Sequence, residues 1–161
     1  MIQYVTGDIL LTDAEAIAHG IAPSDHFKQG LALSLREQWP ALYKDFRHYC
    51  QMKHPVPGEV WSWKGVNGPY IISLMTQEAP ESHDSHPGKA SLPNVNHALK
   101  NLSHEMNEKG LKSVAISKLA TGVGGLSWDD VKPMIEKYFS DSNVVVYVYE
   151  TYTKGQKANE N

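Results

Sequence analysis

A buried strand, a glycine-rich loop and a capped helix follow one another directly in the last third of the chain, and this order constrains the fold more than any other feature. Residues 113–116 lack polar alternation, which is typical of a strand covered on both faces. Three glycines follow within residues 121–126, and Ser127 can cap a helix predicted from Trp128 to Phe139. A strand that passes through a short loop into a helix is the repeating unit of an α/β protein.

The rest of the chain repeats this alternation. Asn67-Gly68 is typical of a hairpin turn, so one strand is expected to run antiparallel. We therefore predict an α/β domain of three layers, α/β/α, with a mixed central sheet over residues 1–150 and a flexible C-terminal tail at residues 151–161. Apolar spacing predicts strands at residues 2–5, 16–19, 59–63, 69–76 and 144–149, and helices at residues 31–39, 42–50 and 92–109.

Composition excludes several classes of protein. The formal charge of −3 argues against nucleic-acid binding through bulk charge. Cys50 is the single cysteine and the eight histidines are dispersed, so we predict no disulfide, no metal site and no cofactor. The longest apolar run has six residues, against roughly 20 in a transmembrane helix, and the N-terminus lacks the pattern of a signal peptide. We expect a cytoplasmic protein that makes no membrane contact.

Three segments can form a site for an anionic ligand. The glycine-rich loop can turn backbone N–H groups outward beside a helix start, which suits a diphosphate; alternatively, its glycines serve only a tight connection. Gly30, just before the helix at residues 31–39, can form a second such site or a plain helix entry. Asp8, directly after the first strand, can accept a hydrogen bond from an exocyclic amine or form an Asx-turn.

Four short segments in this order resemble those of macrodomains. The branch they resemble contains terminal ADP-ribose protein glycohydrolases, ADP-ribose-1″-phosphate phosphatases and antitoxins that remove ADP-ribose from DNA. The similarity covers about residues 1–150. The segments are Tyr-Val-Thr-Gly-Asp-Ile-Leu at residues 4–10, Ala-His-Gly-Ile at 18–21, Gln-Gly-Leu-Ala at 29–32 and Leu-Ala-Thr-Gly-Val-Gly-Gly-Leu-Ser-Trp at 119–128.

The resemblance implies that ADP-ribose lies across the C-terminal ends of the strands. It implies that Asp8 holds the adenine amine and that Ile9 lines the adenine pocket. Tyr149 would pack on the adenine or its ribose, or serve as a strand-edge aromatic. The resemblance also implies a first loop, with Gly30 and Leu31, around the distal ribose and diphosphate, and a diphosphate-binding loop of Thr121, Gly122, Val123, Gly124, Gly125 and Leu126.

Three positions depart from this family pattern. The glycohydrolases of the branch carry a lysine just after the strand that ends here at Thr76, and this chain has Gln77. The human-like enzymes place an aspartate in the diphosphate loop, where this chain has Gly125. The first loop also lacks the asparagine that holds the distal ribose in many macrodomains. Glycohydrolysis by a lysine with a carboxylate partner is therefore not expected.

Two other features resemble the phosphatases of the branch. His19 stands where they carry histidine, and residues 82–91 resemble a Ser-His-Gly-x-Lys-x-Ser stretch in their corresponding loop. Hydrolysis of a 1″-phosphate needs a cation at the phosphate and an acid or base for water. Lys89 can supply the cation, and His19 or His86 the acid or base, because histidine titrates near neutral pH. Alternatively, His19 is structural and the other two are solvent-exposed.

We therefore predict a macrodomain that binds ADP-ribose or a small molecule derived from it, with ADP-ribose-1″-phosphate phosphatase as the first hypothesis. Two alternatives stay open. One is an ADP-ribosyl glycohydrolase that acts on modified protein or nucleic acid through other residues. The other is a binding module without catalysis. The missing lysine and aspartate favour the binding module, and the histidines favour a hydrolase.

Overall fold

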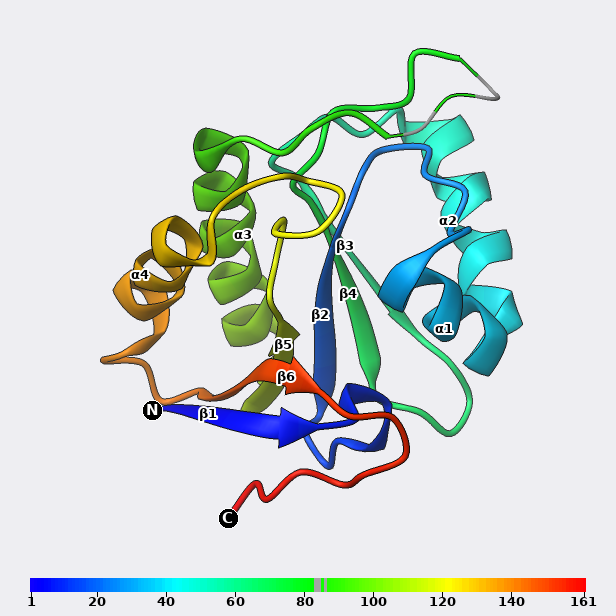
Figure 1. Ribbon diagram of the computed structural model, residues 1–161. Coiled ribbons are helices and arrows are strands. Elements are labelled where there is room, and N and C mark those ends of the chain that lie inside the picture. The colour runs from blue at the N-terminus through cyan, green and yellow to red at the C-terminus, as the bar shows by residue number, and fades with distance from the viewer. Residues whose placement is uncertain (83–84, 86) are drawn as a thin grey trace.

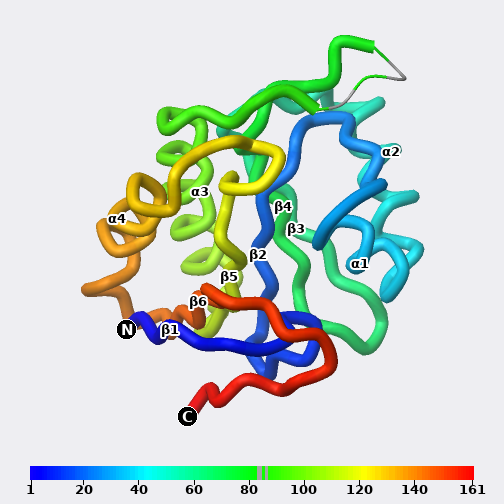
Figure 2. Tube along the Cα trace, viewed as in Figure 1, coloured from blue at the N-terminus to red at the C-terminus, as the bar shows by residue number. Residues whose placement is uncertain are grey.

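The computed structural model describes residues 1–82, 85 and 87–161, which form one mixed sheet between two layers of helices (Figures 1 and 2). This confirms the predicted three-layer α/β architecture. The six strands are β1 (Ile2–Gly7), β2 (Ala16–Ile21), β3 (Val60–Lys64), β4 (Tyr70–Met75), β5 (Ser113–Ser117) and β6 (Val145–Tyr152). The helices are the 3₁₀ turn η1 (Ile9–Leu11), α1 (Gly30–Gln38), α2 (Pro40–Lys53), α3 (Leu92–Lys109) and α4 (Trp128–Phe139).

Five neighbouring strands of the sheet run parallel. The spatial order is β1-β6-β5-β2-β4-β3, and only β3 runs antiparallel, to β4. The turn at Asn67-Gly68 joins β3 to β4, as the sequence predicts. Because the parallel strands share one direction, the loops after β1, β2, β4, β5 and β6 meet at one edge of the sheet, where α/β proteins bind ligands.

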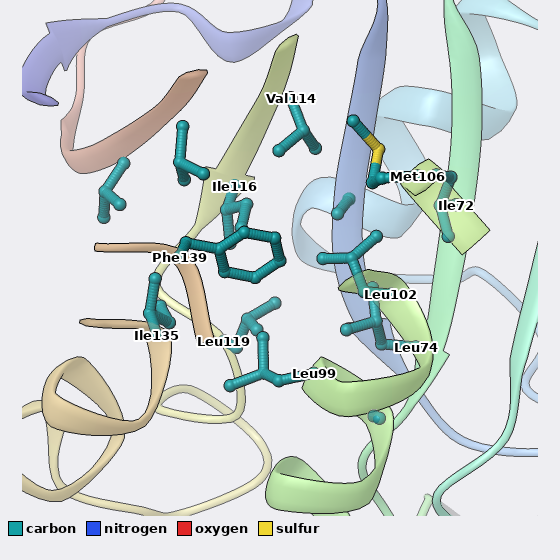
Figure 3. Packing of buried hydrophobic residues seen from close by; sticks show 14 of the residues in the cluster. Ile72, Leu74, Leu99, Leu102, Met106, Val114, Ile116, Leu119, Ile135 and Phe139 are labelled. Atoms are coloured by element: carbon teal, nitrogen blue, oxygen red, sulfur yellow. The ribbon is translucent and has the colours of Figure 1, made fainter. Parts of the chain in front are cut away.

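Each face of the sheet has its own apolar core. Helices α3 and α4 cover one face through residues such as Leu99, Leu102 and Phe139 (Figure 3). Helices α1 and α2 cover the other through Leu35 and Phe46. Full burial of each such side chain contributes about 1.5–3 kcal/mol to the stability of the fold.

The central position of β5 agrees with its lack of polar alternation. Val114, Ala115 and Ile116 are all 0% exposed. Val114 and Ile116 face the α3–α4 core, and Ala115 faces the α1–α2 core. Strand β5 is therefore covered on both faces, and the glycine-rich loop leaves the middle of the sheet.

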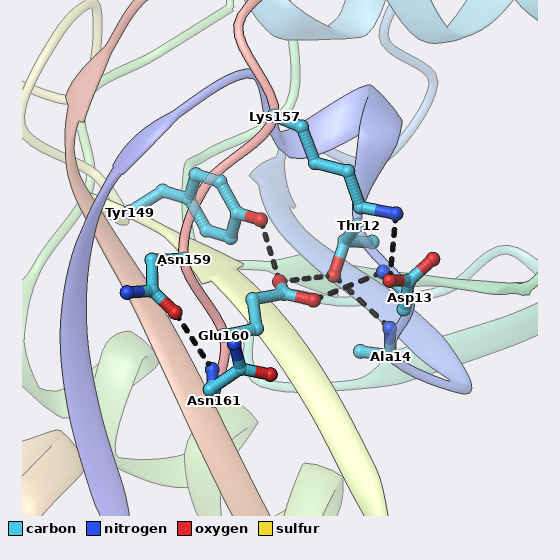
Figure 4. Close-up of polar contacts among 8 residues, drawn as sticks. All are labelled: Thr12, Asp13, Ala14, Tyr149, Lys157, Asn159, Glu160 and Asn161. Atoms are coloured by element: carbon cyan, nitrogen blue, oxygen red, sulfur yellow. Dashed lines mark hydrogen bonds and ion pairs between the residues drawn. The ribbon is translucent and has the colours of Figure 1, made fainter.

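The C-terminal segment lies against the domain. The sequence predicts a flexible tail at residues 151–161, whereas β6 continues to Tyr152 and the following residues make specific contacts. Glu160 accepts hydrogen bonds from the Thr12 and Tyr149 hydroxyls, and Lys157 lies 2.8 Å from the Asp13 carboxylate (Figure 4). These partners are polar, so an apolar pattern cannot reveal them.

In the ranges that the structure describes, no helix combines the length and apolar character needed to cross a bilayer.

Candidate functional site

A two-part cleft lies at the edge of the sheet where the parallel strands end. Its polar half has a volume of about 330 Å³ and is lined by the loops after β2, β4 and β5. Its aromatic half, of about 430 Å³, lies between η1, α1 and the ends of β5 and β6. Four residues line both halves, which makes the cleft continuous: Gly30, Leu31, Ser117 and Lys118.

The glycine-rich loop forms one wall of the polar half. Gly122, Val123 and Gly124 line it, and within the described part of the chain their backbone N–H groups donate no hydrogen bond. The loop is closed by hydrogen bonds from the Gly125 N–H to the Gly122 carbonyl and from the Leu126 N–H to the Ala120 carbonyl, at 3.1 and 2.9 Å. Open amides on a closed loop are suited to an anion.

Close packing within this loop requires a glycine at position 124. A Cβ built there would lie 2.6 Å from the Ala120 carbonyl oxygen, which is backbone and cannot turn aside. Thr121 and Leu126 are not among the described residues that line the cleft, and the Thr121 hydroxyl donates to the Lys118 carbonyl. Their part is therefore to shape the loop.

The start of α1 faces the same cleft. Gly30 has a φ of 61°, a left-handed value that favours glycine, and no side chain caps the helix. The first amides of α1 are thus left without the usual side-chain acceptor. Gly30 and Leu31, both expected in the first loop, lie between the two halves.

His19 lies in the wall of the polar half and is almost fully enclosed. It is 1% exposed, its Nε2 lies 2.9 Å from the Ser73 hydroxyl, and its Nδ1 has no hydrogen-bond partner among the residues that the structure describes. The Phe27 ring packs edge-on against the imidazole at 5.9 Å. Burial lowers the pKa of His19 to about 4, so the ring is neutral at pH 7. The expectation of titration near neutral pH is therefore wrong, because it ignored desolvation.

The structure does not bring Lys89, a second predicted catalytic residue, into the cleft. Lys89 is exposed and is not among the described residues that line it. His86 lies outside the described residues. Gln77, at the position of the family lysine, does line the polar half, and its side-chain amide donates to the Gly88 carbonyl at 3.1 Å.

Three charged residues that line the cleft were not predicted: Asp25, Lys118 and Glu150. Asp25 lines the polar half; its carboxylate accepts a hydrogen bond from the Phe27 N–H at 2.8 Å, and burial raises its pKa. Lys118, one residue beyond β5, is exposed and lines both halves. The sequence does contain signals for the first two. Asp25 is a polar loop residue near the predicted Gly30 site, and Lys118 comes directly after the central strand.

The aromatic half contains Ile9, Tyr149 and Tyr152. Tyr149 is only 5% exposed, and its hydroxyl is bonded to Glu160. Tyr152 was not predicted, because the last strand was expected to end at residue 149; it is 53% exposed and therefore more accessible. The structure makes Tyr152 the aromatic ring most open to a ligand here.

Asp8 lies beside this half but is nearly buried, at 5% exposed. Its two carboxylate oxygens accept hydrogen bonds from the backbone N–H groups of Leu10 and Gly155, at 3.0 and 2.8 Å. It is not among the described residues that line the cleft, whereas its neighbour Ile9 is. The Asx-turn alternative is thus formed, and an adenine amine would be an additional donor to the same carboxylate.

Among the residues that the structure describes, no group of three or more His, Cys, Asp or Glu side chains could hold a metal ion. Among the described residues the cleft offers amides, one lysine, one neutral histidine and two carboxylates, Asp25 in the polar half and Glu150 in the aromatic half. This set can bind a diphosphate, hold a sugar and move one proton.

Sequence comparison finds relatives along nearly the whole chain. The DNA ADP-ribosyl glycohydrolase of Mycobacterium tuberculosis is 28% identical over 153 residues, and human ADP-ribose glycohydrolase OARD1 is 25% identical over 149 residues. The alignments cover 91% and 92% of this chain. They cover 42% of the mycobacterial protein and 90% of the human one, so the chain spans less than half of the bacterial relative.

Solved structures show the same fold. The macrodomain of Thermus aquaticus DarG has a TM-score of 0.80 at 24% identity and covers 93% of this chain and 98% of its own. Thermosipho africanus DarTG in complex with ADP-ribose has a TM-score of 0.80 at 18% identity, and the match covers 97% of this chain and 42% of the DarTG chain. The Macro domain model matches residues 25–135, well over half of the sequence. With the sheet order, the end-of-strand cleft and this match in agreement, the chain belongs to the Macro domain family.

Proposed function

We propose that the chain binds ADP-ribose in the two-part cleft and hydrolyses the bond between the distal ribose and a modified macromolecule. The mycobacterial relative is named DNA ADP-ribosyl glycohydrolase and the human relative ADP-ribose glycohydrolase. A structural neighbour, Thermosipho africanus DarTG, is described in complex with ADP-ribose. The observation that carries the proposal is the shape of the cleft. Its aromatic and polar halves, about 430 and 330 Å³, meet at Lys118 and the start of α1.

Each part of ADP-ribose has a chemically suited wall. The adenine would lie in the aromatic half against Ile9 and Tyr152, because an aromatic face and an aliphatic side chain suit a nucleobase. The diphosphate would lie at the junction, between Lys118 and the open amides of the glycine-rich loop. The distal ribose would then enter the polar half, beside His19 and Asp25.

Asp25 is the proposed acid–base group. It is the one carboxylate among the described residues that line the polar half, and its raised pKa makes it a stronger base than an ordinary aspartate. Water would add to C1″ of the distal ribose while the bond from C1″ to the attached group breaks. Asp25 would accept a proton from the water and then give it to the leaving atom, so that Asp25 is again ionised and ADP-ribose and the unmodified macromolecule are the products.

His19 would have a different part in this scheme. Its neutral ring cannot act as an acid at pH 7, because burial lowers its pKa to about 4. Its contacts with Ser73 and Phe27 instead keep the loop after β2 in place beside the sugar. Gln77 offers an amide where the family glycohydrolases have a lysine, so the proposed route differs from theirs.

ADP-ribose binding is tested first, by calorimetry with the free ligand. Lys118→Gln should weaken binding about tenfold, because a charge-assisted contact to the diphosphate is lost. Lys112→Gln is the matched control, since Lys112 is exposed and precedes β5 at the opposite end of the strand. No heat of binding at millimolar ADP-ribose would contradict the proposal.

Hydrolysis is tested with three substrates side by side: an ADP-ribosylated oligonucleotide, an ADP-ribosylated protein and ADP-ribose-1″-phosphate. We expect release of ADP-ribose from a macromolecule and a loss of about a hundredfold or more in rate in Asp25→Asn. Asp141→Asn, at an exposed position after α4, is the control. Turnover of the 1″-phosphate alone would favour the phosphatase, and binding without turnover of any substrate would favour the binding module.

A further inference from the structure

The outer surface of α1 and α2 concentrates the guanidinium groups of the protein. The chain has two arginines, Arg36 on α1 and Arg47 on α2. Both lie over the same ring, Tyr43, with their Cζ atoms 4.1 and 5.8 Å from its centroid. The helices that carry them lie on the side of the sheet opposite α3 and α4 (Figure 1).

Neither arginine is neutralised by a carboxylate within the described residues. The ion pairs found there involve Lys132, Lys157 and His104 instead. Arg36 donates one hydrogen bond, to the His26 carbonyl at 3.1 Å, which fixes the guanidinium and leaves its other donors available. Two uncompensated guanidinium groups on one ring are therefore open to an external anion.

These residues line two adjoining depressions with volumes of about 640 and 430 Å³. Arg36, Tyr43 and Arg47 line both, so the depressions form one continuous surface. Lys44 lies in the larger one and Lys28 in the smaller, and Asp25 and Glu37 are the carboxylates of the two linings. We call the surface formed by Lys28, Arg36, Tyr43, Lys44 and Arg47 the basic groove.

The basic groove begins where the cleft ends. Asp25 lines both the polar half of the cleft and the smaller depression of the groove. Beneath the surface, the Phe27 ring packs on the His19 imidazole at 5.9 Å and on the Tyr43 ring at 5.5 Å. A chain bound along the groove can therefore extend from a sugar held in the polar half.

We propose that the basic groove binds the phosphodiester backbone of a single-stranded nucleic acid beside the cleft. The planar fork of arginine matches a phosphate in two hydrogen bonds, and the lysines add charge along the same path. A guanidinium plane can also stack on a nucleobase, a contact that an acidic peptide does not offer. The net charge of −3 does not oppose this, because the groove brings four cations together, Lys28, Arg36, Lys44 and Arg47.

This inference deepens the proposed function, since it names the macromolecule that would carry the ADP-ribosyl group. The role of the groove in holding the substrate next to the cleft rests on that function, whereas the binding of unmodified nucleic acid does not. The two can therefore fail separately.

The test is fluorescence anisotropy with a labelled, unmodified single-stranded oligodeoxynucleotide at several salt concentrations. The double variant Arg36→Gln/Arg47→Gln should lose about tenfold in affinity at low salt. The slope of log affinity against log salt should fall by about 1.4, because two phosphate contacts are lost at about 0.7 each for single strands. Free ADP-ribose should bind the double variant as it binds the unchanged protein.

The matched control is Lys64→Gln/Lys109→Gln. The Nζ atoms of these lysines lie 5.0 and 5.7 Å from the centroid of the Tyr70 ring. The control therefore changes the net charge by the same amount as the arginine variant and, like it, removes two cations from one aromatic ring. Equal losses in the two double variants, no loss in the arginine variant, or equally tight binding of poly-glutamate would overturn the inference. Oligonucleotide binding at the groove without ADP-ribose binding in the cleft would overturn the proposed function alone.

Discussion

Acidification should destabilise the fold through His19, because the imidazole is enclosed without a group that balances a positive charge. The ring is 1% exposed, and within the described part of the chain its Nδ1 has no hydrogen-bond partner. Burial lowers the pKa of His19 to about 4 from the ordinary 6.5. Protonation therefore favours the unfolded chain. The stabilisation is fully present above pH 6.5 and is lost as the pH falls toward 4.

The magnitude follows from the separation of the folded and unfolded pKa values of His19. A change from 6.5 to about 4 corresponds to about 3 kcal/mol in the free energy of unfolding once the pH is below both values. Between pH 7 and pH 5 the expected loss is about 2 kcal/mol, because at pH 5 the folded ring is still neutral while most unfolded chains are protonated.

Urea unfolding at pH 7 and pH 5 measures this loss in the unchanged protein and in His19→Gln. Glutamine keeps an amide within reach of the Ser73 hydroxyl but does not titrate. The difference in pH dependence between the two proteins therefore isolates His19 from every other ionisable group. We expect the unchanged protein to lose about 2 kcal/mol more than the variant. Equal losses would refute the burial argument, as would an NMR titration in which this imidazole charges at its ordinary pKa.

Three further substitutions test other parts of the structure. Gly124→Ala should lower both the melting temperature and the affinity for ADP-ribose, because its Cβ would lie 2.6 Å from the Ala120 carbonyl oxygen. Gly122→Ala should melt like the unchanged protein, because among the described residues beyond its chain neighbours no atom lies within 4 Å of that Cβ. Equal melting temperatures of the two variants would refute the packing argument. Tyr152→Ala should weaken the binding of ADP-ribose, as measured by calorimetry, and should leave the melting temperature unchanged, because the ring is 53% exposed. Ser127→Ala should cost about 1 kcal/mol in urea unfolding, because the hydroxyl caps α4 through the Asp129 N–H; an unchanged midpoint would contradict this.

Elements with a clear apolar period were predictable from the sequence. Helix α3 buries Val95, Leu99, Leu102 and Met106 on one face, begins at the Ser91 cap and ends at Gly110 with a φ of 66°. Both the apolar spacing and the capping residues are local signals, so they can be recognised without knowledge of tertiary contacts. The same holds for the glycine-rich loop, whose place between β5 and α4 follows from its neighbours in the chain.

The charged and aromatic residues of the cleft were less accessible to prediction, because tertiary contacts place them. Strand β6 reaches Tyr152 since Thr151 and Tyr152 pair with Thr6 and Gly7 after a shift in register. Asp25 is turned into the polar half by a loop whose shape depends on the buried Phe27 ring. The burial of His19 lowers its pKa, and this burial likewise depends on side chains that are distant in the sequence, such as the Phe27 ring.

Asp8 shows how one residue can satisfy a family pattern and still have a structural task of its own. Its carboxylate joins the end of β1 to the segment after β6, through the Leu10 and Gly155 amides. The Asp8 N–H completes the junction by donating to the Gln156 carbonyl at 2.7 Å. Tyr152 lines the cleft and pairs with Gly7, the residue before Asp8, so the contacts at this junction also help to position the exposed ring. The aromatic half of the cleft is thus built by two segments from opposite ends of the chain, which contribute Ile9 and Tyr152, so neither segment alone predicts it.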